Sequence, residues 1–236
     1  QPLEFLLNKN CEFELFLDLF QKAKPDFGAY LNLKELQVVS LSPENFFTKI
    51  GSNISSFPIK GTRPQSNNHI ENKKNINDLK KSEKDKAEHV MIVDLIRNDL
   101  SKICEYGSVE THNLFKIISY ETIHHMVTEI KGKLKPTIKE VDIFKALFPG
   151  GSITGAPKQR AVEIIDQIES YSRGIYTGAL GVVANNGNMI FNIAIRTLTL
   201  KNGNGVYPVG GGIVWDSNAK EEQQEALDKS KVLNHE

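Results

Sequence analysis

Apolar residues recur at helical spacing in several parts of the chain. Between residues 85 and 104 they surround most of a helix, which predicts a deeply buried one. A second helix fits residues 141–147, an amphipathic helix follows Lys158, and a closing helix begins near Ala219. Residues 65–86 are instead rich in Asn and Lys, a pattern that predicts a solvated loop running into the buried helix.

Long apolar runs fill the segment from 175 to 215. Turn residues at Asn186-Gly187 and at 202–205 separate them, and the runs cover 179–184, 189–200 and 206–214. Asn-Gly between apolar runs is typical of β-hairpins, because both residues tolerate positive φ. The segment therefore predicts a β-meander. Since strands and helices occur in blocks, an α+β fold is favoured over a doubly wound one.

The composition is that of an ordinary soluble protein. A chain of 236 residues, 39% hydrophobic and 25% charged, is long enough to bury one sizeable core, which predicts a single domain over residues 1–236. Lys+Arg and Asp+Glu both number 29, and this zero net charge argues against binding to nucleic acid or an acidic membrane. A small-molecule substrate is favoured.

Neither secretion nor membrane insertion is indicated. No apolar run approaches the roughly 20 residues that span a bilayer, and the start lacks the layout of a signal peptide. The two cysteines, Cys11 and Cys104, are too few for a disulfide framework and lack metal-ligand spacing. They indicate buried thiols in a reducing compartment, and hence a cytoplasmic protein.

Two acidic pairs are each spaced three residues apart on a predicted helix. They are Asp85 with Glu88 and Glu222 with Glu225, and Lys229 lies one turn after the second pair. Like charges at this spacing repel, and a hard cation such as Mg²⁺, bound through oxygens, would relieve them. Taken separately, each pair is better explained as acidic residues that face water and complement the helix dipole.

A glycine-rich turn at 148–158 precedes the amphipathic helix. Gly150 and Gly155 have the spacing of a P-loop, but Ala156 stands where that motif needs lysine, so the motif is excluded. Thr154 is a candidate cap of the helix, and Pro157 suits its first turn. Free N–H groups at a helix start can bind an anionic oxygen, although a turn that merely packs explains the same residues.

Several single residues gain meaning only from their context. Alternation places Arg196 on the polar side of a strand, where it could clamp a carboxylate or simply face solvent. Gly210-Gly211-Gly212 permits close approach to a ligand, or a strand bulge. His124 and His125 have no third ligand nearby, which argues against zinc. Lys60 by itself is one lysine among many.

Six segments, taken in order from 42 to 230, form a recognisable series. They are Ser42-Pro43-Glu44, Pro58-Ile59-Lys60-Gly61-Thr62-Arg63-Pro64, the segment 88–100 (EHVMIVDLIRNDL), Gly155-Ala156-Pro157-Lys158, Ala194-Ile195-Arg196-Thr197 and Gly212-Ile213-Val214. Together they resemble the chorismate-binding enzyme family. The resemblance implies an α+β fold of two antiparallel sheets packed face to face, with helices outside and the active site in the central cleft. It also implies that part of the family's N-terminal region is missing.

The resemblance assigns roles to individual residues. It makes Glu88 and Glu225 direct ligands of Mg²⁺, with Asp85 and Glu222 bound through water. His125 matches the family's active-site histidine beside the substrate ring. The residues expected to hold the substrate carboxylates are Ser152, Thr154, Gly155, Tyr176, Arg196, Gly210, Gly211, Gly212 and Lys229.

Position 60 separates the reactions within the family. Members that form anthranilate or isochorismate usually have alanine there, whereas those that form 4-amino-4-deoxychorismate resemble Pro-Ile-Lys-Gly-Thr. The amine of Lys60 can attack C2 of chorismate while Glu44 protonates the departing C4 hydroxyl, which gives a covalent adduct. Ammonia then attacks C4 of this adduct and displaces the lysine. The resemblance thus implies a magnesium-dependent transferase of p-aminobenzoate and folate biosynthesis.

The source of ammonia and two alternative functions stay open. The chain lacks a nucleophilic-cysteine motif for glutamine hydrolysis, so ammonia would come from solution or from a glutamine amidotransferase partner. The same site could form anthranilate or isochorismate, against which Lys60 argues. A catalytically silent subunit that binds chorismate or a partner is the other alternative. The intact catalytic and metal-binding candidates argue against it: Glu44, Lys60, Glu88, Glu222 and Glu225.

Overall fold

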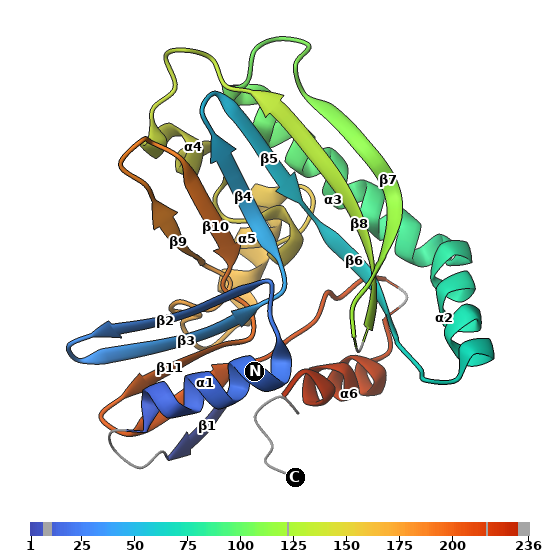
Figure 1. The fold of residues 1–236 in the computed structure, drawn as a ribbon, viewed down its shortest axis with the longest axis vertical. Coiled ribbons are helices and arrows are strands. Elements are labelled where there is room, and N and C mark those ends of the chain that lie inside the picture. The colour runs from blue at the N-terminus through green and yellow to red at the C-terminus, as the bar shows by residue number, and fades with distance from the viewer. Residues whose placement is uncertain (7–10, 122, 216, 231–236) are drawn as a thin grey trace. The chain divides into compact units, whose positions relative to one another are not determined.

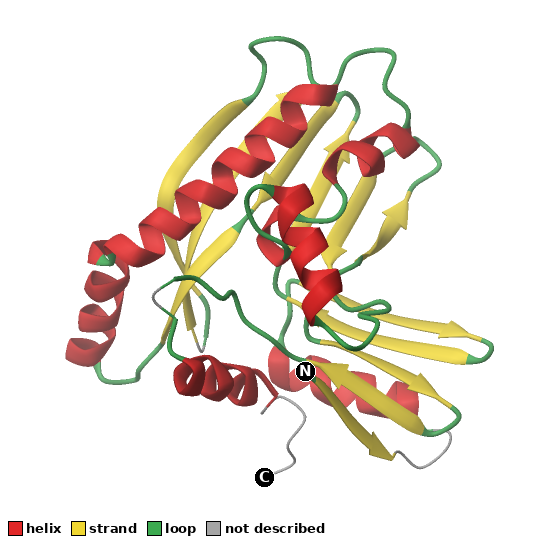
Figure 2. Ribbon diagram, turned by 180° about the vertical axis from the view of Figure 1, so that it is seen from behind, coloured by secondary structure: helices red, strands yellow, loops and turns green. Residues whose placement is uncertain are grey.

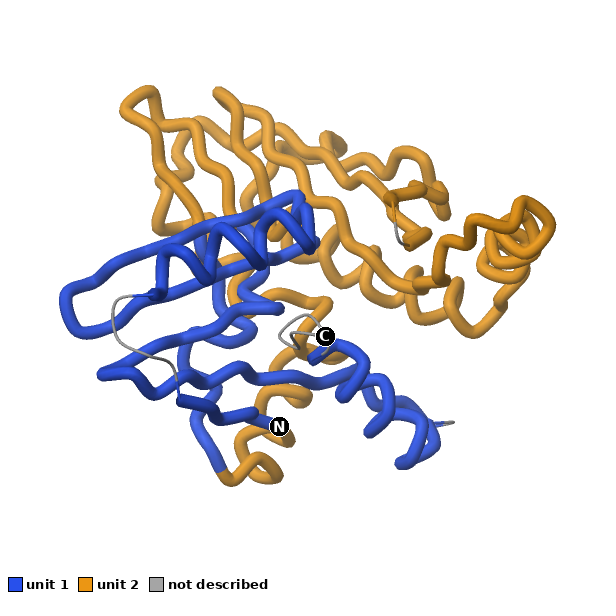
Figure 3. Tube along the Cα trace, turned by 60° about the horizontal axis from the view of Figure 1, so that its bottom comes forward, with its two compact units in different colours: residues 1–44, 171–180, 192–236 blue, residues 45–170, 181–191 orange. Residues whose placement is uncertain are grey.

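The computed structural model describes residues 1–6, 11–121, 123–215 and 217–230. Their contacts form two compact units (Figure 3). Unit 1 comprises residues 1–44, 171–180 and 192–236, and unit 2 comprises residues 45–170 and 181–191. The chain therefore passes from one unit to the other four times, and neither unit is a continuous stretch of sequence.

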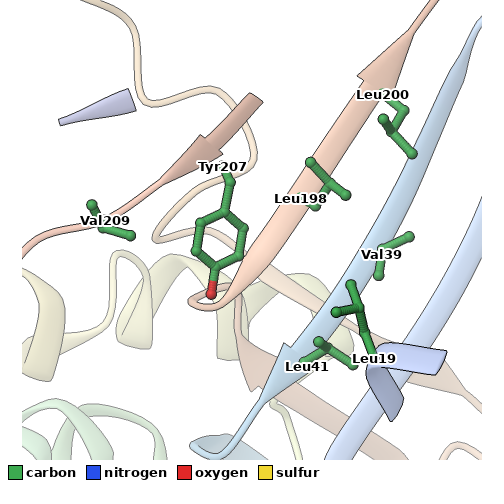
Figure 4. Close-up of a cluster of buried hydrophobic side chains, with 7 residues drawn as sticks. All are labelled: Leu19, Val39, Leu41, Leu198, Leu200, Tyr207 and Val209. Atoms are coloured by element: carbon green, nitrogen blue, oxygen red, sulfur yellow. The ribbon is translucent and has the colours of Figure 1, made fainter. Parts of the chain in front are cut away.

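Unit 1 is built on a five-stranded antiparallel sheet in the order β1-β12-β11-β3-β2 (Figure 1). The strands are β1 (Pro2–Leu6), β2 (Phe27–Leu33), β3 (Leu36–Ser42), β11 (Thr197–Lys201) and β12 (Asn204–Pro208). Helix α1 (Glu12–Ala23) packs on this sheet, and α6 (Ala219–Ser230) closes the described chain. The core joins Leu19 of α1 to side chains of the sheet and of the segment after it (Figure 4): Val39, Leu41, Leu198, Leu200, Tyr207 and Val209.

The seven-stranded sheet lies mostly in unit 2. Its order is β6-β8-β5-β4-β10-β9, and β7 also pairs with β8. The strands are β4 (Asn45–Ile50), β5 (Asn53–Phe57), β6 (Ile59–Pro64), β7 (Glu110–Ser119), β8 (Ile123–Lys133), β9 (Ala179–Val183) and β10 (Met189–Ile193). Together the two antiparallel sheets and their helices confirm the predicted α+β class.

Helices cover the seven-stranded sheet of unit 2. The long α3 (Glu83–Ile103) contacts β6 and β8 and packs beside α4 (Glu140–Leu147) (Figure 2). The remaining helices are α2 (His69–Lys81), the 3₁₀ turn η1 (Gly151–Ile153) and α5 (Lys158–Ile168). No helix in the described part of the chain is long and apolar enough to cross a membrane.

The predicted loop over residues 65–86 is wrong, because α2 occupies most of it. The side chain of Asn68 accepts hydrogen bonds from the backbone N–H groups of Ile70 and Glu71 and so caps the helix. Leu79 is completely buried and anchors it. A single buried leucine in a polar segment leaves too weak a periodicity to be read from the sequence.

The buried helix at 85–104 is confirmed in extent as α3, but only one face of it is buried. Ile92, Val93 and Leu100 are buried, whereas Val90 and Met91 are more than a third exposed. The prediction for the cysteines is likewise half right. Cys104 is buried, which raises its pKa to about 11, and Cys11 is exposed.

The meander predicted for 175–215 is interrupted at residues 194–196. Both predicted hairpins form, with Gly187 and Asn202 at positive φ in the turns. However, β10 belongs to the seven-stranded sheet and β11 to the five-stranded one. The strand predicted through Arg196 is therefore wrong, since Arg196 lies in the break with φ of 48°.

Candidate active site

Strand β6 carries Lys60 and bends immediately after it. Opposite β8, the register shifts between Lys60 and Thr62, and Gly61 adopts a φ of 74° at this bulge. A β-carbon at Gly61 would lie 2.8 Å from the side chain of Leu79 and 3.2 Å from that of Asp85. Glycine is required here because the strand turns sharply and also touches the helices.

The amine of Lys60 lies between the glycine-rich turn and helix α3. Its Nζ donates a hydrogen bond of 3.4 Å to the carbonyl oxygen of Ser152. His89, on α3, is completely buried, and its Nε2 lies 2.6 Å from the hydroxyl of Thr128. Burial and the charge of Lys60 lower the pKa of His89 to about 4, so this imidazole is neutral at pH 7.

His125 is oriented by the residue that follows the bulge. Its Nδ1 lies 3.0 Å from the hydroxyl of Thr62, and its ring meets the ring of Tyr120 edge-on. The neighbouring His124 is a buried structural residue whose two ring nitrogens contact Ser119 and Asn72. The structure therefore distinguishes the two adjacent histidines by their partners.

The first acidic pair lies at the start of α3 in unit 2. Arg63 donates a hydrogen bond of 2.9 Å to Asp85 and one of 2.6 Å to Asp78, so Asp85 is held by a cation from β6. Among the described residues, the half-buried carboxylate of Glu88 has no hydrogen-bond or ion-pair partner. Because a partly buried carboxylate without a partner is costly, Glu88 is available to bind a cation taken up from solution.

The glycine-rich turn holds Ser152, Thr154 and Gly155 between α4 and α5. The predicted helix cap is wrong: the hydroxyl of Thr154 donates 2.9 Å to the carbonyl oxygen of Gly150, within the turn. Helix α5 begins instead after Pro157, without a side-chain cap.

The second acidic pair gathers in unit 1 with most of the predicted substrate-binding residues. A β-carbon at Gly211 would lie 3.2 Å from Oε2 of Glu222 and 3.3 Å from Oε1 of Glu225. A β-carbon at Gly210 would lie 3.1 Å from the hydroxyl of Tyr176. These glycines keep their backbone close to the acidic residues and to Tyr176, and Gly212 follows in the same segment.

Lys229 closes this group of residues. Its Nζ donates 2.6 Å to Glu225 and 2.9 Å to the carbonyl oxygen of Gly210, which ties α6 to the glycine segment. Glu222 accepts a hydrogen bond of 2.6 Å from the hydroxyl of Ser217. The carboxylates therefore present oxygen atoms that are already held in place.

Glu44 and Arg196 also belong to unit 1. Glu44 is buried just after β3, and its backbone N–H is held by Ser42 at 3.2 Å. Arg196 lies close enough to Tyr207 to affect its ionisation: burial raises the pKa of Tyr207, and the positive charge of Arg196 partly offsets this rise. The hydroxyl of Tyr207 has no hydrogen-bond partner among the described residues.

The sequence motifs match a known family along nearly the whole chain. The family described as chorismate binding enzyme matches residues 2–235. The chain belongs to the chorismate-binding enzyme family. This membership confirms the resemblance of its six ordered motifs.

Relatives within the chorismate-binding family carry out more than one reaction. Aminodeoxychorismate synthase component 1 of Escherichia coli K12 is 44% identical over 218 residues, which is 92% of this chain and 48% of that protein. Anthranilate synthase component 1 of Lactococcus lactis is 40% identical over 204 residues, covering 86% of this chain and 45% of that protein. The chain thus spans about half the length of the curated relatives it matches.

A solved structure of the family shares the fold. Anthranilate synthase component I from Streptococcus pneumoniae TIGR4 superimposes with a TM-score of 0.89 at 33% identity, covering 98% of this chain and 51% of that one. Relatives named for different reactions have similar sequence identity to this chain, so family membership alone does not determine its reaction. The residues of the site must do so.

The predicted magnesium ligands have suitable donor atoms. All four predicted ligands, Asp85, Glu88, Glu222 and Glu225, offer carboxylate oxygens, which Mg²⁺ prefers. No group of three or more potential ligands lies close together among the described residues; Asp85 and Glu88 belong to unit 2, and Glu222 and Glu225 belong to unit 1. The magnesium site stays a prediction.

Three residues that hold predicted site residues or lie beside them were not predicted from the sequence. They are Thr62, Arg63 and His89, and all three lie inside the motifs that indicated the family. Their place beside Lys60 or Glu88 in the sequence was the available signal. Their partners lie 15 to 63 residues away and could not be inferred from spacing.

Proposed function

We propose that this chain converts chorismate to 4-amino-4-deoxychorismate with ammonia. The observation that carries the proposal is Lys60, in the segment Pro-Ile-Lys-Gly-Thr of β6. Its amine is half-buried beside the Ser152 carbonyl and the neutral His89, where a nucleophile is partly shielded from water. Several relatives named aminodeoxychorismate synthase component 1, at 38–44% identity, support this choice.

In the proposed reaction Lys60 acts first as the nucleophile and later as the leaving group. Its amine forms a bond to C2 of chorismate while the C4 hydroxyl departs as water with a proton from Glu44. Ammonia then forms a bond at C4, the ring double bonds shift back and the Lys60 amine leaves C2. His125, held by Thr62, lies beside the ring in this assignment.

The remaining residues hold the substrate and a cation. The substrate carboxylates are assigned to Ser152, Thr154, Gly155, Tyr176, Arg196, Gly210, Gly211, Gly212 and Lys229. Glu88 and Glu225 would bind Mg²⁺ directly, and Asp85 and Glu222 through water. When bound, Mg²⁺ supplies positive charge that offsets the acidic pairs and a substrate carboxylate. Ammonia comes from solution or from a glutamine amidotransferase partner.

Turnover of chorismate in the presence of MgCl₂ and excess ammonium tests the proposal. We expect 4-amino-4-deoxychorismate, measured as p-aminobenzoate after a lyase is added. Lys60→Ala should abolish or redirect the reaction, whereas Lys131→Ala, a half-exposed lysine on β8, should leave it unchanged. Mass spectrometry should detect a substrate adduct on Lys60. Anthranilate as the sole product, or unchanged turnover in Lys60→Ala, would contradict the proposal.

A further inference from the structure

A buried ion pair joins two motif residues, Asp99 and Lys158, to which the proposed reaction assigns no role. Asp99, near the end of α3, is 3% exposed, and the ammonium of Lys158 donates hydrogen bonds to its Oδ2 and, at 2.8 Å, to the carbonyl oxygen of Leu147. Lys102 donates 2.7 Å to the other oxygen of Asp99. Both carboxylate oxygens are therefore neutralised by cations.

Two of these residues, Leu147 and Lys158, flank the glycine-rich turn. Leu147 is the last residue of α4, directly before the turn, and Lys158 is the first residue of α5, directly after it. One ammonium group thus ties the beginning and the end of the turn to each other and to α3.

The middle of the turn rests on the same face of α3. A β-carbon at Gly151 would lie 2.9 Å from the side chain of Leu95, and Leu95 precedes Asp99 by one helical turn. Ser152 follows Gly151, and its carbonyl oxygen accepts the hydrogen bond from Lys60. A path of direct contacts therefore leads from α3, through the turn, to the amine of Lys60.

We propose that Asp99 and Lys158 are positioning residues that lock the turn at 148–157 onto α3. By doing so they fix the Ser152 carbonyl against Lys60, and they hold the backbone groups assigned to a substrate carboxylate. The consequence for turnover rests on the proposed function, but the locking of the turn does not. Stability alone is a weak reason for a buried ion pair, because neutral side chains of similar size often replace one without loss.

The variant Lys158→Met removes the cation and keeps most of the side-chain volume. Lys102→Met is the matched control, since Lys102 binds the same carboxylate but comes from α3 itself and is half-exposed. We expect Lys158→Met to lower kcat/KM for chorismate consumption about 100-fold, as a small displacement of positioned groups does. Amide hydrogen exchange within 148–157 should become faster. Lys102→Met should stay within about twofold of the unaltered chain in kcat/KM, and its exchange should not change.

The double variant Asp99→Asn with Lys158→Met separates positioning from stability. It leaves no buried charge unpaired, so we expect it to fold, to keep the fast exchange in the turn and to keep the low kcat/KM. Lys158→Arg, which retains the charge, should recover part of both losses.

Hydrogen exchange is measured without substrate, and chorismate consumption is measured whatever the product, so the test does not depend on the reaction assigned above. Unchanged exchange in Lys158→Met, an equal effect in Lys102→Met, or full recovery in the double variant would overturn the positioning role.

Discussion

The three residues that follow Lys60 in β6 each contribute a different contact or conformation that shapes the candidate site. Gly61 allows the bulge, Thr62 holds His125, and Arg63 holds Asp85. Lys60, His125 and Asp85 are thus connected through consecutive residues of β6. A displacement of this strand would move all three groups together.

The first prediction concerns the hydroxyl of Thr62. Thr62→Val keeps the shape of the side chain but removes the partner of Nδ1 of His125. Loss of one such hydrogen bond is worth about 1 kcal/mol, so kcat should fall about fivefold. Steady-state kinetics with chorismate measures this effect.

The matched control for Thr62 is an exposed threonine of the same sheet. Thr111→Val, in β7, alters no described contact of His125 and should leave kcat unchanged. A fivefold fall in Thr111→Val, or none in Thr62→Val, would contradict the proposed orientation of His125.

At the scale of elements, the end of β10 is fastened by polar contacts to other parts of unit 1. The side chain of Asn192 accepts 3.2 Å from the N–H of Leu180 and donates to Ser40 at 3.3 Å and to the carbonyl oxygen of Phe27 at 3.4 Å. Ser40 in turn bonds Thr197 at 2.9 Å. This network joins β9, β10, β2, β3 and β11 at the place where the predicted meander breaks.

The second prediction is that Asn192→Leu destabilises the fold strongly. A leucine side chain cannot make the hydrogen bonds of the Asn192 amide to the N–H of Leu180, to Ser40 and to the carbonyl oxygen of Phe27. Each buried polar group that is left unsatisfied costs about 1–3 kcal/mol. We expect the free energy of unfolding to fall by roughly 3 kcal/mol in urea denaturation.

An exposed asparagine of a strand provides the comparison. Asn53→Leu, in β5, should change the free energy of unfolding by no more than about 0.5 kcal/mol. Equal stability of the two variants would show that the network around Asn192 does not hold these strands.

At the scale of the whole molecule, the units are interleaved in sequence. Residues 181–191 return to unit 2 after a detour through unit 1 and bring β10 beside β4. Phe191, at the end of this segment, lies 5.3 Å from Phe47 and 4.9 Å from Phe144 between ring centroids. A short, distant segment thus completes the sheet and aromatic cluster of unit 2.

The third prediction compares two fragments of unit 2. The fragment 45–191 contains every residue of the unit and should unfold cooperatively in a thermal melt. The fragment 45–170 lacks β9, β10 and Phe191, which leaves the edge of β4 that faces away from β5 unpaired and removes one ring from the aromatic cluster, so it should not show a cooperative transition. Identical melting curves would contradict this account of the unit.

Local patterns determined the parts of this protein whose partners lie close in sequence. The helices at 141–147 and from Ala219, and the Asn-Gly turns, follow from periodicity and backbone preference and were confirmed. The ordered motifs also determined the family, because each keeps its residue types in one short stretch.

Only the tertiary structure decided how distant residues are paired. Lys158 meets Asp99 from 59 positions away, Thr62 meets His125 from 63, and the chain changes sheets at Arg196 without any polar or apolar signal. Such contacts depend on how strands and helices pack, and packing leaves no periodicity in the sequence. The sequence therefore predicted the side chains of the proposed chemistry, and the fold decided which distant residues contact them.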